Sequence, residues 1–122
     1  MAVCSRKAGD VHMMITKKCI FDILNVIAND ESFDICYNSK NNEYAFPNAE
    51  LYHLHKKLND YSFERLAYCC YLLSCDGYIE LQLSTSLRGF SISRICGITL
   101  KGYELLEKLN NELKEDCRKR QA

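Results

Sequence analysis

Hydrophobic residues recur at helical spacing in four separate stretches of the chain. Cys19, Ile23 and Ile27 lie four residues apart on one face of a first helix, and Phe63 and Leu66 begin a similar stripe further on. Stripes of this kind predict helices over 16–28, 48–58, 63–75 and from 100 towards the C-terminus. Each predicted helix therefore has one apolar face to bury.

A second pattern alternates between apolar and polar residues, which is typical of half-buried strands. Phe33, Ile35 and Tyr37 alternate before a run of Asn, Ser and Lys residues, and Tyr44 and Phe46 alternate after it. Asn and Ser are common turn formers. The segment therefore predicts either a short hairpin, or one short strand followed by a loop.

A longer hairpin is predicted between the third and the last helix, with 79–84 pairing against 90–97. Residues that typically begin or end helices precede and follow this predicted hairpin in the sequence. Ser62 is a candidate N-cap for the third helix, and Gly77 supplies the left-handed residue that closes a helix. Thr99 is a candidate N-cap for the last helix. These boundaries predict a mixed α+β chain.

The size and composition of the chain are those of one globular domain. It has 122 residues, of which 48% are hydrophobic and 26% are charged. Sixteen Lys and Arg residues are balanced by sixteen Asp and Glu residues, which argues against attachment to nucleic acid or lipid by bulk charge alone. We predict a loose N-terminal arm over 1–14, a folded domain over 15–117 and a basic tail over 118–122.

The eight cysteines bear on compartment and metal chemistry. The N-terminus has no apolar signal-peptide region, and no stretch is long enough for a transmembrane helix. We therefore expect a cytoplasmic protein without membrane contact, in which most thiols are free and buried. A zinc site needs closely spaced ligand pairs such as C-x2-C, which the sequence lacks. We expect neither a metal nor a cofactor.

No catalytic motif stands out. The five glycines are dispersed, so there is no phosphate-binding loop, and the G-x-S-x-G motif is missing. Cys75 with a histidine could form a thiol nucleophile, but eight cysteines and three histidines make chance pairs common. The sequence therefore predicts a protein that is not an enzyme.

The order of predicted elements is that of a winged helix-turn-helix, and two motifs narrow this match. The sequence YLLSCDGYIE at 71–80 resembles the end of a third helix and the first wing strand. The sequence ITLKGYELL at 98–106 resembles the entry into the last helix. Both motifs resemble the small phage and prophage winged-helix proteins of the YjcQ family, over about 15–110.

The resemblance implies a winged helix-turn-helix with an additional short extended or hairpin segment between the first two helices. It also implies a DNA-binding transcriptional regulator in the cytoplasm of a bacterial host cell. Lys and Arg side chains would contact the phosphates of double-stranded DNA. The candidate nucleic-acid-binding residues are Lys17, Lys18, His53, Lys56, Lys57, Arg65, Arg88 and Arg94. Gathered on one side they would form a phosphate footprint, and scattered they would be a solvated surface.

The outer face of the third predicted helix favours a different partner, because only Arg65 is basic there. The candidate protein-interface residues on this face are Glu64, Tyr68, Tyr71 and Leu72. The alternative function is therefore a protein-binding accessory factor, such as a phage-encoded inhibitor of a host defence nuclease, like an anti-CRISPR protein. A third interpretation is that the rest of the fold, for example 33–46, covers this face.

The last predicted helix has a broad apolar face that includes Leu105, Leu106, Leu109 and Leu113. This width suffices to join the core of its own chain. It also suffices to contact a second copy, so a homodimer through the last helix is a further expectation.

Overall fold

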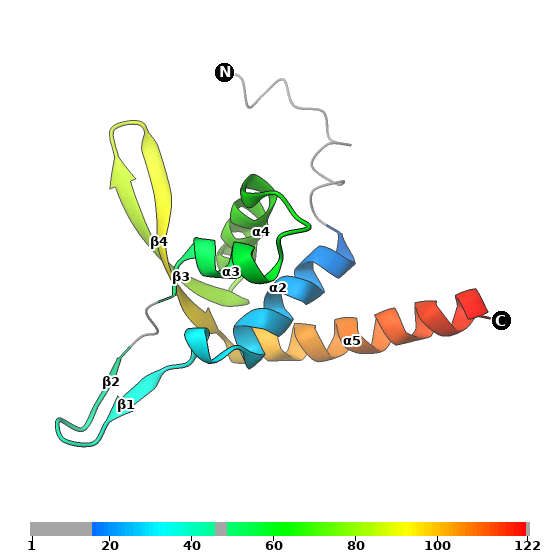
Figure 1. Ribbon diagram of the computed structural model, residues 1–122, viewed down its shortest axis with the longest axis horizontal. Helices are drawn as coiled ribbons and strands as arrows, with labels where there is room; N and C mark the ends of the chain where they lie inside the picture. Colours follow the sequence, from blue (N-terminus) through cyan, green and yellow to red (C-terminus); the bar gives the residue numbers. More distant parts are fainter. Residues whose placement is uncertain (1–15, 46–48, 122) are drawn as a thin grey trace.

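The computed structural model describes residues 16–45 and 49–121, with side chains as far as Asp116 (Figure 1). These residues form an α+β fold of four helices and two antiparallel hairpins, in the predicted order. The predicted arm over 1–14 lies outside the described residues, as do Phe46 and Pro47. The elements are α2 (Lys17–Asn29), η2 (Glu31–Phe33), β1 (Cys36–Asn38), β2 (Glu43–Ala45), α3 (Leu51–Lys57), α4 (Phe63–Cys75), β3 (Ile79–Ser86), β4 (Gly89–Ile98) and α5 (Leu100–Gln121).

The helix α2 lies at the centre of the fold and carries the first predicted stripe. Thr16 caps it by accepting a hydrogen bond from the Cys19 N–H at 3.1 Å. Cys19, Ile23 and Leu24 are fully buried. Since α2 contacts α3, α4, α5 and β4, the hydrophobic core is built around its apolar face.

The helix α4 has the bounds that the sequence predicts. Ser62 is its N-cap, and its hydroxyl accepts a hydrogen bond from the Arg65 N–H at 3.1 Å. At the other end, Gly77 has a φ of +82°, and the Tyr78 N–H donates to the Leu73 carbonyl at 2.9 Å. This left-handed closure turns the chain directly into β3, as predicted.

The helix α3 starts at Leu51, later than the predicted start at 48, because Ala49 belongs to the sheet. The Ile95 N–H on β4 donates to the Ala49 carbonyl at 2.9 Å, in an isolated antiparallel bridge. Ala49 and Ile95 are both fully buried. Ala49 therefore supplies a single residue of a third strand beside β4.

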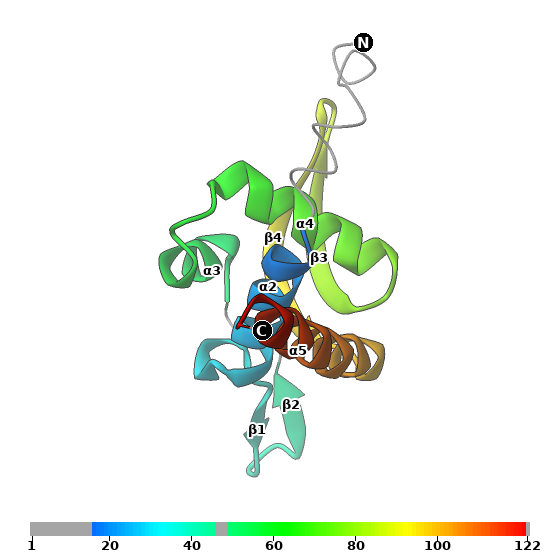
Figure 2. The same cartoon turned by 90° about the vertical axis from the view of Figure 1, so that its right-hand side faces the viewer.

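The strands β3 and β4 form the long antiparallel hairpin that the sequence predicts. Ile79 pairs with Ile98 at its base, and Ser86 pairs with Gly89 at its tip. The pairing extends nearer to the tip than the predicted 79–84, and two register shifts bend the ladder. The two hairpins of the described chain project in different directions, β3–β4 to the upper left and β1–β2 to the lower left in Figure 1, and to the top and the bottom in Figure 2.

The short hairpin β1–β2 confirms the first of the two structures predicted for the Asn-rich segment. Tyr37 pairs with Tyr44, and every residue of both strands is exposed. Phe33 was expected to begin the strand pattern, but it lies in η2 and is buried in the core. The alternating pattern therefore begins later than predicted, at the point where the chain leaves the core.

The helix α5 follows β4 through Thr99, the predicted N-cap. The Thr99 hydroxyl accepts a hydrogen bond from the Gly102 N–H at 3.1 Å and also contacts the Gly77 and Tyr78 carbonyls. The helix continues through Gln121, whereas the sequence placed a tail from 118. Leu109 is buried in the core, and Leu105, Leu106 and Leu113 are half-buried.

The cysteines divide between the core and the surface. Of the six with described side chains, Cys19, Cys69 and Cys70 are buried, whereas Cys36 and Cys75 are exposed. The expectation that most thiols are buried therefore holds for only half of them. All six are free. Within residues 16–45 and 49–121, every helix is too short or too polar to span a lipid bilayer.

Candidate binding groove

A groove of about 440 Å³ lies between α4 and β4. No charged residue lines it, and serine is the only lining residue that is neither aliphatic nor aromatic. The lining residues are Leu51, Phe63, Ala67, Tyr68, Tyr71, Phe90, Ser91 and Ile92. Apolar clefts of this size with a few polar atoms are typical binding sites in proteins.

The helical repeat of α4 places one wall of the groove. Phe63, Ala67 and Tyr71 lie four residues apart, along one edge of the buried face of the helix. On the other wall, Phe90 and Ile92 are alternate residues of β4 and point to the same side of the hairpin. The groove therefore joins a helix edge to a strand face.

Two aromatic side chains of the groove are unusually exposed for their size. Phe63 is 46% exposed and Phe90 is 52% exposed. The Phe90 ring packs on Tyr71 with 4.8 Å between centroids, and the Phe63 ring meets His55 edge to face at 5.7 Å. Phe63 was predicted to join the buried stripe of its helix, but its position in the first turn leaves it only partly covered.

The predicted protein-interface residues divide between the groove and its surroundings. Tyr68 and Tyr71 line the groove and are half-buried. Glu64 is exposed and Leu72 is half-buried, and neither lines the groove. Sequence reasoning did not single out Leu51, Phe90 or Ile92 for a site, because their contribution depends on how α3 and β4 approach α4.

The segment 33–45 does not cover the outer face of α4. The β1–β2 hairpin lies on the opposite side of the helices from α4 in both views (Figures 1 and 2). The idea that this segment covers the predicted interface is therefore wrong for the described residues.

Three of the predicted DNA-binding lysines are engaged by acidic side chains. Lys17 pairs with Glu112 at 3.1 Å. Lys18 pairs with Asp22 at 3.2 Å, and Lys57 pairs with Asp30 at 3.4 Å. Such surface pairs contribute little stability, but they reduce the positive potential that a phosphate would meet.

Two more of the predicted cations lie against tyrosine rings. Lys56 Nζ is 5.5 Å from the centre of the Tyr52 ring, and the Arg65 guanidinium is 5.5 Å from that of Tyr61. Both rings belong to residues outside the groove lining.

The other three predicted residues have separate positions. His53 completes a capping box, since its Nδ1 accepts a hydrogen bond from the Glu50 N–H at 3.0 Å. Arg88 lies at the tip of the β3–β4 hairpin and Arg94 lies within β4. The eight candidates thus come from α2, α3, α4 and the hairpin, and the structure does not bring them together around the groove.

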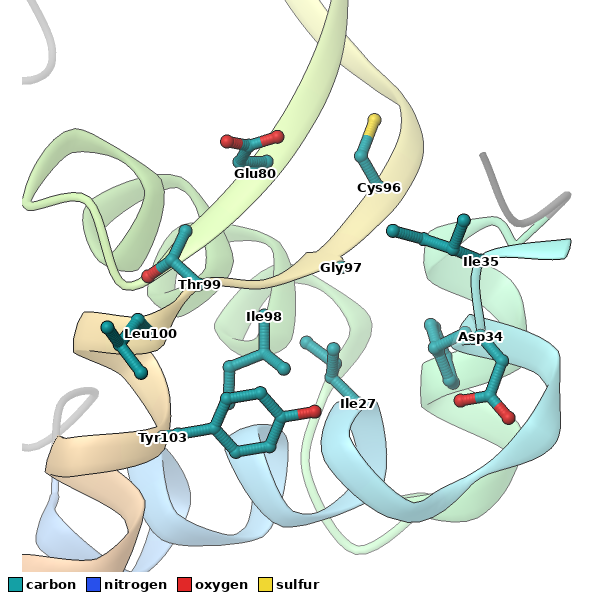
Figure 3. A pocket seen from close by; sticks show the side chains of 11 residues that line it. Ile27, Asp34, Ile35, Glu80, Cys96, Gly97, Ile98, Thr99, Leu100 and Tyr103 are labelled. Atoms are coloured by element: carbon teal, nitrogen blue, oxygen red, sulfur yellow. The ribbon is translucent and has the colours of Figure 1, made fainter. Parts of the chain in front are cut away.

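A second cavity of about 480 Å³ lies at the junction of α2, η2, the sheet and the start of α5 (Figure 3). The carboxylates of Asp34 and Glu80 lie on opposite sides of it, and the Tyr103 hydroxyl points towards Ile27. Burial raises the pKa of the Cys96 thiol, which makes it a weaker nucleophile at neutral pH. The arrangement offers no pair of carboxylates for acid–base catalysis.

The candidate thiol nucleophile Cys75 ends α4 at the surface, whereas both described histidines lie on α3. Those histidines are already engaged, His53 in its capping box and His55 with the Phe63 ring. Among the described side chains, no three His, Cys, Asp or Glu residues are placed to hold a metal ion.

A comparison of the chain with protein families, curated proteins and solved structures found no match. The relationship to the YjcQ family, the homodimer through the last helix and the cytoplasmic location all stay predictions. What the groove binds has to be inferred from its shape and chemistry.

Proposed function

We propose that this protein is a non-enzymatic binding module that holds an apolar segment of another protein in the groove between α4 and β4. One observation carries the proposal: two half-exposed aromatic rings, Phe63 and Phe90, flank a lining without charged groups. Aromatic anchors in uncharged pockets dominate the energetics of protein interfaces. Whether the partner is a host nuclease stays a prediction.

The proposal includes a winged helix-turn-helix arrangement. It is supported by the pair α3–α4, the hairpin β3–β4 that follows, and the closing helix α5. The bridge from Ala49 to Ile95 supports it too, since it adds a third strand position between the first and second helices of the fold. In this arrangement α4 is the helix that would enter a DNA groove.

The charges near α4 favour a protein over DNA as the partner. A phosphate-binding face needs several unpaired cations, and α4 carries Arg65 alone, which lies over the Tyr61 ring. The acidic Glu64 is exposed on the same helix. Arg88 and Arg94 remain on the hairpin, so double-stranded DNA is the competing partner that the experiment must test.

A displayed library of random short peptides tests the proposal. The wild-type protein is panned beside Phe90→Ser and a matched control, Tyr44→Ser. Tyr44 also lies on a hairpin, is 74% exposed and packs on another tyrosine at 4.8 Å, but it is remote from the groove. We expect the wild type and Tyr44→Ser to enrich the same apolar peptides, and Phe90→Ser to lose them.

The same proteins are titrated with random duplex DNA at low and at physiological salt. We expect no salt-dependent retention of DNA. Two results together would overturn the proposal: salt-dependent binding to duplex DNA, and no enriched peptide whose binding is lost in Phe90→Ser. The protein would then be better described as a DNA-binding regulator.

A further inference from the structure

The outer edge of β4 carries no strand of the described chain between Gly89 and Ser93. β4 pairs with β3 on one side, and on the other side Ile95 is the only residue of β4 whose backbone is bonded to another described residue, through the Ala49 carbonyl. Between Gly89 and Ser93 the described residues place no backbone group against this edge. This stretch contains neither a charged residue nor a proline, which are common devices that protect an exposed strand edge.

The hairpin turn determines which backbone groups face outward. Leu87 and Arg88 form a two-residue turn that joins Ser86 to its partner Gly89. In such a hairpin the pair beside the turn is hydrogen-bonded, and the next pair directs its N–H and C=O groups outward. By this alternation, Phe90 and Ile92 direct their backbone groups away from β3, as Ile95 does towards Ala49.

The apolar groove lies beside this free edge. Its lining includes the consecutive residues Phe90, Ser91 and Ile92, although neighbouring side chains of a strand point to opposite faces. The groove therefore reaches the backbone of β4 as well as its side chains. The opposite wall of the groove includes Phe63 and Ala67 of α4, so the apolar lining lies next to this edge.

We propose that the occupant of the groove is an extended segment of a partner protein that adds to β4 as a third strand. The added strand continues the line that Ala49 begins and pairs with the outward groups of Phe90 and Ile92. Its alternate apolar side chains enter the groove against Phe63 and Ala67. This inference rests on the proposed function and specifies the conformation and chemistry of its partner.

The peptides enriched by the wild-type protein provide the test. In a peptide bound as a strand, every second residue is apolar and every second N–H group bonds to β4. In a peptide bound as a helix, apolar residues would recur every three or four positions. Each residue of one enriched peptide is N-methylated in turn, and binding is measured by fluorescence anisotropy. We expect N-methylation at alternate residues to weaken binding about tenfold, and at the residues between them to have little effect.

The outcomes separate this inference from the function on which it rests. Enriched peptides with helical spacing, or without alternating sensitivity, would overturn strand addition and leave the groove as the binding site. If no enriched peptide loses binding in Phe90→Ser, both strand addition and the proposed binding function are overturned. A wild-type dimer that Phe90→Ser converts to monomer would overturn the inference as well, because a second copy would then occupy the edge.

Discussion

The Tyr71 ring on α4 and the Phe90 ring on β4 lie 4.8 Å apart between centroids, with an angle of 31° between their planes. This contact joins the helix to the hairpin at the groove. Because Tyr71 is only half-buried and Phe90 is 52% exposed, the pair can contribute to an interface as well as to the fold.

Phe90→Ser is expected to lower the free energy of unfolding by only about 1 kcal/mol, the typical size of one aromatic pair contact. Half of the Phe90 side chain already contacts solvent in the native state. Urea unfolding followed by circular dichroism measures the change. A loss of several kcal/mol would mean that Phe90 is a core residue, and it would weaken the use of this variant in the binding experiments.

Gly102→Ala is expected to destabilise the protein by about 1–3 kcal/mol, although alanine is the better helix former. A Cβ at Gly102 would overlap the Tyr78 carbonyl and come within 2.6 Å of Ile98 Cγ1. The Tyr78 carbonyl cannot move freely, because it accepts hydrogen bonds from the Thr99 N–H and hydroxyl.

The control for that substitution is Asn111→Ala, at an exposed position of the same helix. Thermal unfolding of both variants compares the two effects. An unfolding temperature of Gly102→Ala equal to or above that of the wild type would contradict the close approach of α5 to the turn at Tyr78.

Thr99→Ala is expected to lower the free energy of unfolding by about 1–2 kcal/mol, since it removes the N-cap of α5. The same hydroxyl reaches back to the Gly77 carbonyl at 2.6 Å, so the variant also loosens the link between α4 and α5. Thr99→Ser keeps the hydroxyl and should retain most of the stability. Equal losses in the Ala and Ser variants, measured by urea unfolding, would assign the effect to the methyl group instead.

Stability is expected to fall as the pH rises above about 9. Burial raises the pKa of the Cys70 thiol from its usual value of 9.0 to about 12. The folded state then holds a proton that the unfolded chain releases, so the stabilisation is complete below pH 9 and is lost as the pH rises towards 12. The slope for one such thiol is about 1.4 kcal/mol per pH unit.

Urea unfolding on both sides of pH 9 measures this dependence, with Cys70→Ala as the comparison. The variant should lose stability less steeply with pH than the wild type, whatever its stability at neutral pH. Parallel slopes in the two proteins would show that Cys70 does not cause the fall.

Local signals in the sequence predicted most of the elements. Helix ends depend on hydrogen bonds and backbone angles within one helical turn, as at Ser62, Gly77 and Thr99. A short stretch of sequence is therefore enough to predict where these helices begin and end. The later start of α3 could not be predicted in this way. Ala49 is held in the sheet by Ile95, which is remote in sequence, and only the tertiary fold brings the two together.

The candidate site was predicted only in part, for a similar reason. The helical repeat identified Tyr68 and Tyr71 as residues of the outer face of α4. The opposite wall comes from Phe90 and Ile92, whose alternation predicted a strand but not its position beside α4. The ion pairs of Lys17 and Lys57 also join segments that are distant in the sequence. The sequence pattern could not predict them, and both lysines were therefore included among the candidate DNA contacts.

Nuclear magnetic resonance spectra of isotope-labelled protein, titrated with an enriched peptide, report whether the peptide binds in the groove between α4 and β4. We expect the largest shift changes at Leu51, Ala67 and Ile92, with little change at Ile35 and Leu100 beside the second cavity. Saturable changes centred on Ile35 and Leu100, with the groove signals unmoved, would contradict binding in this groove.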